Sequence, residues 1–271
     1  MGEFGSSFVF QSSQRIEGGI MNKIIKQKIK EVEEREKVKV ILAVESGSRS
    51  WGFESKDSDY DVRFIYLREK DDYLKLEGLR DVIEWQLDET LDINGWDIQK
   101  ALRLLYKSNP TLFEWCSSPI VYYETSEADE LRKLLTSYFS DKKLLYHYWN
   151  MARTNYREYL KNDKVKAKKY FYVLRPILAA NWVLEHNSNP PMEFEKLIED
   201  QLSSDLKPIV YDLLEKKKSV NELDLVDRID VLNQYIEENI DNLEEEAQSL
   251  LDKNDTNWEP LNDFFLKLID E

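Results

Sequence analysis

Two aspartates stand two positions apart in a segment that is otherwise apolar and aromatic. Asp59 and Asp61 belong to DYDVRFIYL, residues 59–67, in which β-branched and aromatic side chains alternate as in a half-buried strand. Side chains two apart on a strand leave the same face, so these carboxylates could share a divalent cation. An isolated Asp-x-Asp is more often a solvated edge, but carboxylates among buried-looking residues need a cation to relieve their repulsion. The pair therefore predicts a metal site.

A Gly-Ser pair precedes the aspartates at the end of another predicted strand. Gly47 and Ser48 follow the apolar segment VKVILAVES, residues 38–46. A residue without a Cβ lets backbone N–H groups come close to a ligand, and the serine adds a hydroxyl. We therefore interpret Gly47 and Ser48, together with the adjacent Arg49, as a cradle for phosphate groups.

A third carboxylate would complete the metal site, and two aspartates qualify. Asp92 in LDI and Asp97 in WDI are both flanked by apolar residues. Asp92 is favoured because it lies inside a predicted strand, whereas Asp97 stands where a helix begins and could instead stabilise its first turn. The true partner should come within about 4 Å of the Asp59 and Asp61 carboxylates, a range in which they can share metal ions. Asp57 is a weaker candidate, as a loop residue.

A basic and aromatic stripe is predicted on a helix in the second half of the chain. Lys168, Tyr172 and Arg175 stand at i, i+4 and i+7, so they share one helix face, next to Lys169. Lysine would offer point charges, and arginine a planar donor fork, to a triphosphate or an RNA backbone. The alternative is an ordinary solvated helix surface.

The remaining pattern describes the elements that must position these groups. Alternation predicts strands over 38–46, 59–67, 81–87 and 91–96, the last two joined by a turn at Asp88, Glu89 and Thr90. Helical spacing predicts helices over 22–37 and 97–108. Asn109 with Pro110 ends the second one and could start another, since Asn caps helices and Pro suits a first helical turn. Residues 119–124 form either a short strand or an extended linker, and the periodicity beyond them is helical.

These elements predict an α+β fold. An N-terminal α/β domain with a mixed sheet, residues 21–124, carries the acidic site, and an all-helical C-terminal domain, residues 125–271, closes over it. Residues 1–20 mix Gly, Ser and isolated apolar residues without a period, and a second methionine, Met21, follows them. We interpret residues 1–20 as a vector-derived or disordered segment outside the fold.

Composition excludes several classes of protein. Charged residues make up 34% of the chain and aromatic residues 12%, and no apolar run approaches the roughly 20 residues of a membrane span. The net charge of −15 argues against strong non-specific binding to DNA. The single cysteine, Cys116, excludes an internal disulfide and cysteine-based zinc clusters, and we interpret it as a core residue of a cytoplasmic protein.

The order Gly47, Ser48, Asp59, Asp61 resembles the nucleotidyltransferases of the DNA polymerase beta superfamily. Their fold carries a Gly-Ser at the end of one strand and two acidic residues around an apolar one on the next. A closer resemblance, carried by GWDIQKALRLLYKSNPTLFEWCSSPIVY and KKYFYVLRPILAANW, is to the YcgL-type predicted nucleotidyltransferases. It extends from about residue 40 to about residue 185. That group is associated with RNA ligases and is proposed to act in RNA repair.

The resemblance implies transfer of a nucleoside monophosphate from an NTP to a hydroxyl acceptor, with release of pyrophosphate. It implies two Mg²⁺ ions, with Mn²⁺ as an alternative, held by Asp59, Asp61 and a third carboxylate; Asp92 or Asp97 could also accept the hydroxyl proton. Gly47, Ser48, Arg49 and the basic stripe would bind the nucleotide. The acceptor is an RNA end, a small molecule or a protein. The alternative is a non-catalytic nucleotide-binding or antitoxin-like partner protein.

Overall fold

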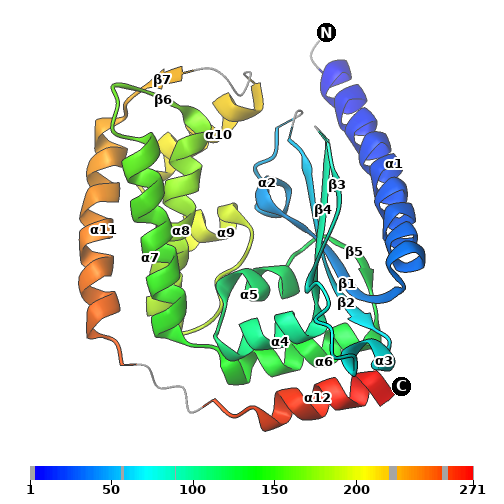
Figure 1. Ribbon diagram of the computed structural model, residues 1–271. Coiled ribbons are helices and arrows are strands. Elements are labelled where there is room, and N and C mark those ends of the chain that lie inside the picture. The colour runs from blue at the N-terminus through cyan, green and yellow to red at the C-terminus, as the bar shows by residue number, and fades with distance from the viewer. Residues whose placement is uncertain (1–3, 56–57, 89, 220–224, 252–255, 271) are drawn as a thin grey trace.

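The structure, a computed structural model, describes residues 4–55, 58–88, 90–219, 225–251 and 256–270. Figure 1 shows a sheet-containing half and a helical half side by side. Both halves and the mixed sheet agree with the predicted α+β fold. Among the described residues, no helix combines the length and the apolar character needed to cross a bilayer.

A five-stranded mixed sheet forms the centre of the first half. Its strands are β1 (Val38–Ser46), β2 (Tyr60–Arg68), β3 (Val82–Leu87), β4 (Leu91–Asp97) and β5 (Val121–Glu124). The order across the sheet is β3-β4-β2-β1-β5, with β2 and β4 parallel and the other neighbours antiparallel. The segment at 119–124 is thus an edge strand rather than a linker. In the turn between β3 and β4, Asp88 accepts hydrogen bonds from the backbone of Thr90 and Leu91; Glu89 lies outside the described residues.

Helices cover both faces of this sheet because its central strands are apolar on both sides. One face packs against α1 (Phe4–Glu36) through Ile25, Ile29 and Val32. The helices associated with the other face and its ends are α2 (Gly47–Ser50), α3 (Lys70–Tyr73), α4 (Ile98–Tyr106), α5 (Pro110–Cys116), α6 (Ser126–Leu135) and α12 (Glu259–Asp270). Cys116 is buried in that layer, 4% exposed, as expected.

α1 begins earlier than the sequence predicts. The helix expected over 22–37 extends back to Phe4, through the segment interpreted as lying outside the fold. Once the packed turns at Ile25 to Val32 are formed, each further hydrogen bond requires only one more residue to be ordered, whereas a new helix must order three residues for its first bond. Residues 4–20 therefore continue a helix that the core nucleates.

The second half is a helical bundle with a short strand pair. Its helices are α7 (Asp141–Tyr159), α8 (Ala167–His186), α9 (Phe194–Gln201), α10 (Lys207–Ser219) and α11 (Asp230–Ser249), and a 3-10 turn (Thr136–Tyr138) precedes them. β6 (Lys164–Lys166) and β7 (Leu225–Asp227) form an antiparallel pair, so the prediction of an all-helical second half was wrong at this point. A strand of three residues is too short to show an alternation that could be told apart from helical periodicity, and only Val165 of β6 is buried.

The cores over the sheet and the core of the bundle do not divide at the predicted boundary between residues 124 and 125. α6 packs over the sheet through Ala128 and Leu131, and the bundle core begins at Leu144 apart from Phe53, which is inserted from the other half. The chain then returns, because Leu261 and Phe264 of α12 belong to the core over the sheet. An amphipathic helix buries its apolar face wherever a matching surface exists, and its own sequence does not specify that surface.

Candidate nucleotide and metal site

Parallel pairing of β2 with β4 brings Asp92 beside Asp61. The register aligns Asp61 with Asp92, on strands about 4.8 Å apart. The same ladder aligns Asp97 with Tyr66, five residues away from Asp61, or about 16 Å at 3.3 Å per residue. Of the two candidates for a third carboxylate, the fold therefore places Asp92 at the site and Asp97 at the far end of the strand.

Asp97 instead caps a helix. Its side chain accepts a hydrogen bond from the backbone N–H of Gln99 (2.8 Å), at the first turn of α4, and another from the Tyr73 hydroxyl (3.0 Å). Burial is the main reason that its pKa is raised. The prediction of Asp97 as a catalytic residue is therefore corrected: it has the structural role at a helix start that the sequence left open.

Gly47 lies against the carboxylate of Asp61. Its φ of +68° is in the left-handed region, and a Cβ built on it would lie 2.3 Å from Asp61 Oδ2. Ser46 at the end of β1 pairs with Asp61, so the turn at Gly47 begins where the acidic strand begins. Only glycine combines this backbone conformation with so close an approach.

Asp61 is electrostatically strained. Its pKa is raised, mainly because burial disfavours the charged form. The Arg63 guanidinium lowers that pKa, while the charges of Asp92 and Asp59 raise it further. A divalent cation beside Asp61 would offset both the burial and the repulsion.

Asp59 and Arg49 lie at the entrance to the acidic strand. Asp59 is exposed and immediately precedes β2. Arg49 Nε donates to the carbonyl oxygen of Asp59 (3.0 Å), and Nη2 donates to that of Ser58 (2.6 Å). The Arg49 guanidinium also stacks over Tyr60, 3.7 Å from the ring centroid. Arg49 thus joins the Gly47-Ser48 turn to the segment that carries Asp59. Asp57 lies outside the described residues.

Glu45 is a site residue that the sequence reading missed. It is 0% exposed, and its Oε1 accepts a hydrogen bond from the backbone N–H of Asp61 (2.8 Å), while its Oε2 accepts one from the Tyr122 hydroxyl. Burial raises the pKa of Glu45 from 4.5 to about 7, against the lowering effect of these hydrogen bonds. The available signal was an acidic residue at the end of an otherwise apolar strand.

Comparison with known proteins identifies the family of the chain. Residues 21–267 match the model of the RNA repair pathway DNA polymerase beta family. The chain belongs to this family. A relative, the uncharacterized protein YcgL of Bacillus subtilis strain 168, is 48% identical over 253 residues, which cover 93% of this chain and 97% of the relative.

A solved structure described as a nucleotidyltransferase-like protein from Exiguobacterium sibiricum 255-15 is 17% identical. The match covers 83% of this chain and 75% of that one, with a TM-score of 0.31. Membership of the polymerase beta family supports a general nucleotidyltransferase role for the chain.

The basic stripe predicted as nucleotide-binding in this family member is only partly at the surface. Arg175 is 2% exposed, and its guanidinium is paired with Glu114 (3.0 Å) and stacked under Trp51, 4.4 Å from the ring centroid. Its prediction as a phosphate contact is therefore corrected: it joins the bundle to the sheet-containing half. Lys168, Lys169 and Tyr172 are half-buried on the same helix, and the Lys169 ammonium lies 3.3 Å from the centroid of the Tyr159 ring.

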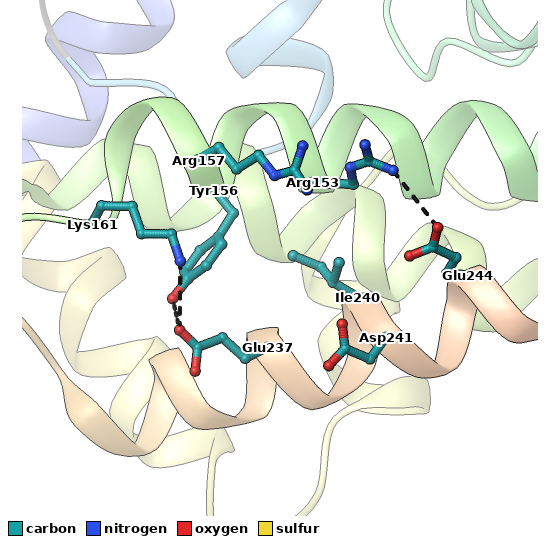
Figure 2. Close-up of a pocket in the computed structure, with 8 residues that line it drawn as sticks. All are labelled: Arg153, Tyr156, Arg157, Lys161, Glu237, Ile240, Asp241 and Glu244. Atoms are coloured by element: carbon teal, nitrogen blue, oxygen red, sulfur yellow. Dashed lines mark hydrogen bonds and ion pairs between the residues drawn. The ribbon is translucent and has the colours of Figure 1, made fainter.

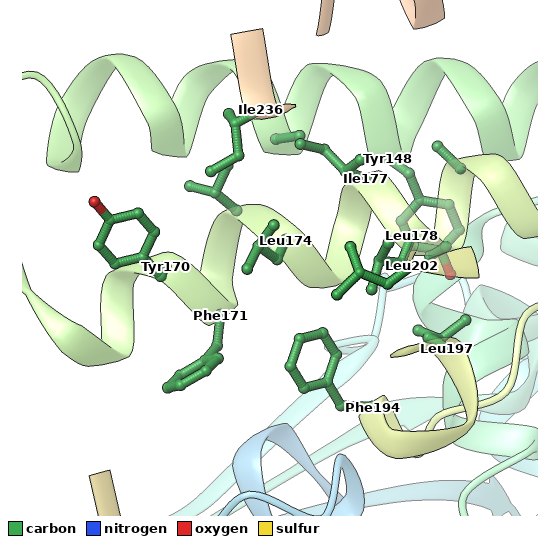
Figure 3. Packing of buried hydrophobic residues seen from close by; sticks show 14 of the residues in the cluster. Tyr148, Tyr170, Phe171, Leu174, Ile177, Leu178, Phe194, Leu197, Leu202 and Ile236 are labelled. Atoms are coloured by element: carbon green, nitrogen blue, oxygen red, sulfur yellow. The ribbon is translucent and has the colours of Figure 1, made fainter. Parts of the chain in front are cut away.

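Aromatic residues directly after the Gly47-Ser48 turn are inserted into the helical bundle. Phe53 is 1% exposed and lies 5.4 Å from Phe171 and 5.5 Å from Phe194, between ring centroids; Figure 3 shows these two partners on α8 and α9. The backbone N–H of Phe194 donates to the carbonyl oxygen of Trp51 (2.9 Å), and Lys217 on α10 donates to that of Phe53. The bundle therefore holds the C-terminal end of the turn.

Two other charged groups lie in the bundle, apart from the acidic strand. Figure 2 shows a pocket between α7 and α11, with basic residues on one wall and mainly acidic residues on the other. It is lined by Arg153, Tyr156, Arg157, Lys161, Glu237, Ile240, Asp241 and Glu244. Glu185, His186 and Asp200 form an exposed cluster whose ligand atoms lie within 4.8 Å of one another. Both groups belong to the bundle, whereas Asp61 and Asp92 stand on strands of the sheet.

Proposed function

We propose that this protein transfers a nucleoside monophosphate from an NTP to a hydroxyl group and releases pyrophosphate. One observation carries the proposal: the fold brings Asp61 and Asp92 together, and Asp61 Oδ2 lies so close to the Gly47 turn that only a residue without a Cβ fits there. The family supports the reaction class. The acceptor oxygen would bond to the α-phosphorus as the bond to the pyrophosphate oxygen breaks.

The residues present fit Mg²⁺. Asp59, Asp61 and Asp92 offer only carboxylate oxygens, the donors that Mg²⁺ and Mn²⁺ prefer, and the Arg63 guanidinium pairs with one oxygen each of Asp61 and Asp92. Two ions would be held by these three aspartates and by substrate oxygens. When bound, such ions neutralise the charge that develops on the entering and leaving oxygens.

The chain's own groups would orient the triphosphate. Gly47 would permit the terminal phosphates to come close to the backbone, and the backbone N–H and hydroxyl of Ser48 would bind them. Arg49, fixed by the carbonyl oxygens of Ser58 and Asp59, would hold the turn against the acidic strand. Asp92, as a carboxylate next to Asp61, would take the proton of the acceptor hydroxyl.

An RNA end is the acceptor that the family description suggests. The net charge of −15 opposes broad adhesion to RNA, so binding of an RNA end would need a local basic surface on the protein. Lys168 and Lys169 supply such a surface. They lie on α8, which also carries Tyr172, the residue whose ring packs against Trp51. Small molecules and protein side chains are the other acceptors to test.

The test is transfer of label from each α-³²P-labelled NTP in the presence of Mg²⁺ to RNA oligonucleotides, small hydroxyl compounds and proteins. We expect labelling with the wild type and none with Asp61→Asn or Asp92→Asn. Asp97→Asn is the matched control, because asparagine also caps helices and the residue lies on the same strand away from the site. If the three variants and the wild type all bind NTP without labelling any acceptor, the protein is a non-catalytic nucleotide-binding protein and the proposed reaction is wrong.

A further inference from the structure

Arg63 connects the two aspartates that the fold brings together. It stands two residues after Asp61 on β2, so both side chains leave the same face of the sheet. Its Nη2 donates to Asp61 Oδ1 (3.2 Å) and to Asp92 Oδ2 (2.7 Å).

The arginine is itself held in place. Its Nη1 donates to the carbonyl oxygens of Val62 (3.0 Å) and Asp92 (3.1 Å), so the guanidinium has four acceptors around it. The side chain is 19% exposed. Two of these acceptors belong to the backbone of adjacent strands, whose positions the ladder determines. The guanidinium is therefore a fixed part of the sheet surface rather than a mobile counter-ion.

Arg63 donates to one oxygen of each carboxylate and not to the other. It binds Oδ1 of Asp61, while Oδ2 of the same group points at Gly47. It binds Oδ2 of Asp92 and leaves Oδ1. A carboxylate has acceptor capacity on both oxygens, so one can be hydrogen-bonded while the other ligates a cation.

We propose that Arg63 is a positioning residue, which aligns Asp61 and Asp92 so that a divalent cation meets an assembled pair of ligands. This inference rests on the proposed function, because it assigns the metal to these aspartates. The planar fork is essential to the role, since only a guanidinium reaches two carboxylates and two carbonyl oxygens at once. The opposite relation, in which Arg63 competes with the cation, predicts tighter metal binding once Arg63 is removed.

The experiment is a Mn²⁺ titration followed by the electron paramagnetic resonance signal of free Mn²⁺, with and without a non-hydrolysable α,β-methylene NTP. The variants are Arg63→Met, which removes charge and fork, and Arg63→Lys, which keeps the charge. Arg103→Met, which removes an exposed arginine of α4, is the control. Thermal unfolding of each variant establishes that it is folded, and Arg63→Lys serves if Arg63→Met does not fold.

We expect Arg63→Met to weaken Mn²⁺ binding by about 10–100-fold, the usual effect of removing a hydrogen-bonding partner of a metal ligand. Arg63→Lys should lose most of the same affinity, and Arg103→Met none. In the transfer assay, the Mg²⁺ concentration at half-maximal rate should rise, with most of the rate returning at saturating Mg²⁺.

Unchanged or tighter Mn²⁺ binding by the Arg63 variants would overturn this inference and leave the proposed function intact. If the wild type binds no Mn²⁺ either with or without the NTP analogue, the metal site itself is overturned. The two failures are therefore distinguishable.

Discussion

Replacing Gly47 with alanine should damage the site far more than the fold. The new Cβ would lie 2.3 Å from Asp61 Oδ2 and 3.2 Å from Asp61 Cγ, so the carboxylate must rotate or the turn must move. The backbone conformation at φ +68° adds about 1–2 kcal/mol of strain for a residue with a Cβ. Displacing a reacting group by about 1 Å can cost on the order of 10²-fold in rate. We therefore expect modest destabilisation and about a hundredfold loss of nucleotide transfer.

Gly52→Ala is the matched control for this prediction. Gly52 also has a positive φ, +80°, but a Cβ there meets no atom within 4 Å. Both variants should lose stability in urea unfolding because both carry the backbone strain, and Gly47→Ala should lose somewhat more because its Cβ also displaces Asp61. Only Gly47→Ala should lose Mn²⁺ affinity and transfer activity. If the two variants lose activity equally, backbone strain explains the effect, and the contact between Gly47 and Asp61 has no functional role.

Three further outcomes follow from buried groups. Between pH 4.5 and about 7 the folded state binds more protons at Glu45 than the unfolded state does, so wild-type stability should fall as pH rises. Glu45→Gln should match the wild type at pH 4.5 and exceed it by up to about 3 kcal/mol at pH 8 in metal-free urea unfolding. Phe53→Ala and Leu213→Ala both open the bundle core and should each cost about 2–5 kcal/mol, but only the former should raise the KM for NTP. Burial raises the pKa of Cys116 to about 12, so the native thiol should resist Ellman's reagent and react once unfolding exposes it.

Local sequence was sufficient where the physical cause is local. Runs of apolar and β-branched residues made β1 and β2 recognisable. Asn109 with Pro110 marks a true helix start, where the Asn109 side chain accepts a hydrogen bond from the backbone N–H of Leu112. Asp61 with Gly47 could be associated before the fold was known, because the turn between two paired strands keeps them close.

Contacts between segments that are far apart in the chain could not be predicted from local sequence. Arg175 has the spacing of an exposed stripe, yet it is buried because Glu114 and Trp51 from the other half of the protein cover it. α12 carries an apolar stripe that would fit either core, and the fold assigns it to the sheet. Helical periodicity reports that a face is buried, and it does not report against what.

The sequence by itself therefore determined that a glycine turn and two aspartates lie close together, because those groups are adjacent along one strand–turn–strand unit. Only the tertiary structure decided that Asp92, and not Asp97, lies beside them. That choice depends on the register of β4 against β2, and a parallel register is defined by the crossover that separates the strands in the chain. The same pairing places the fixed guanidinium of Arg63 between Asp61 and Asp92.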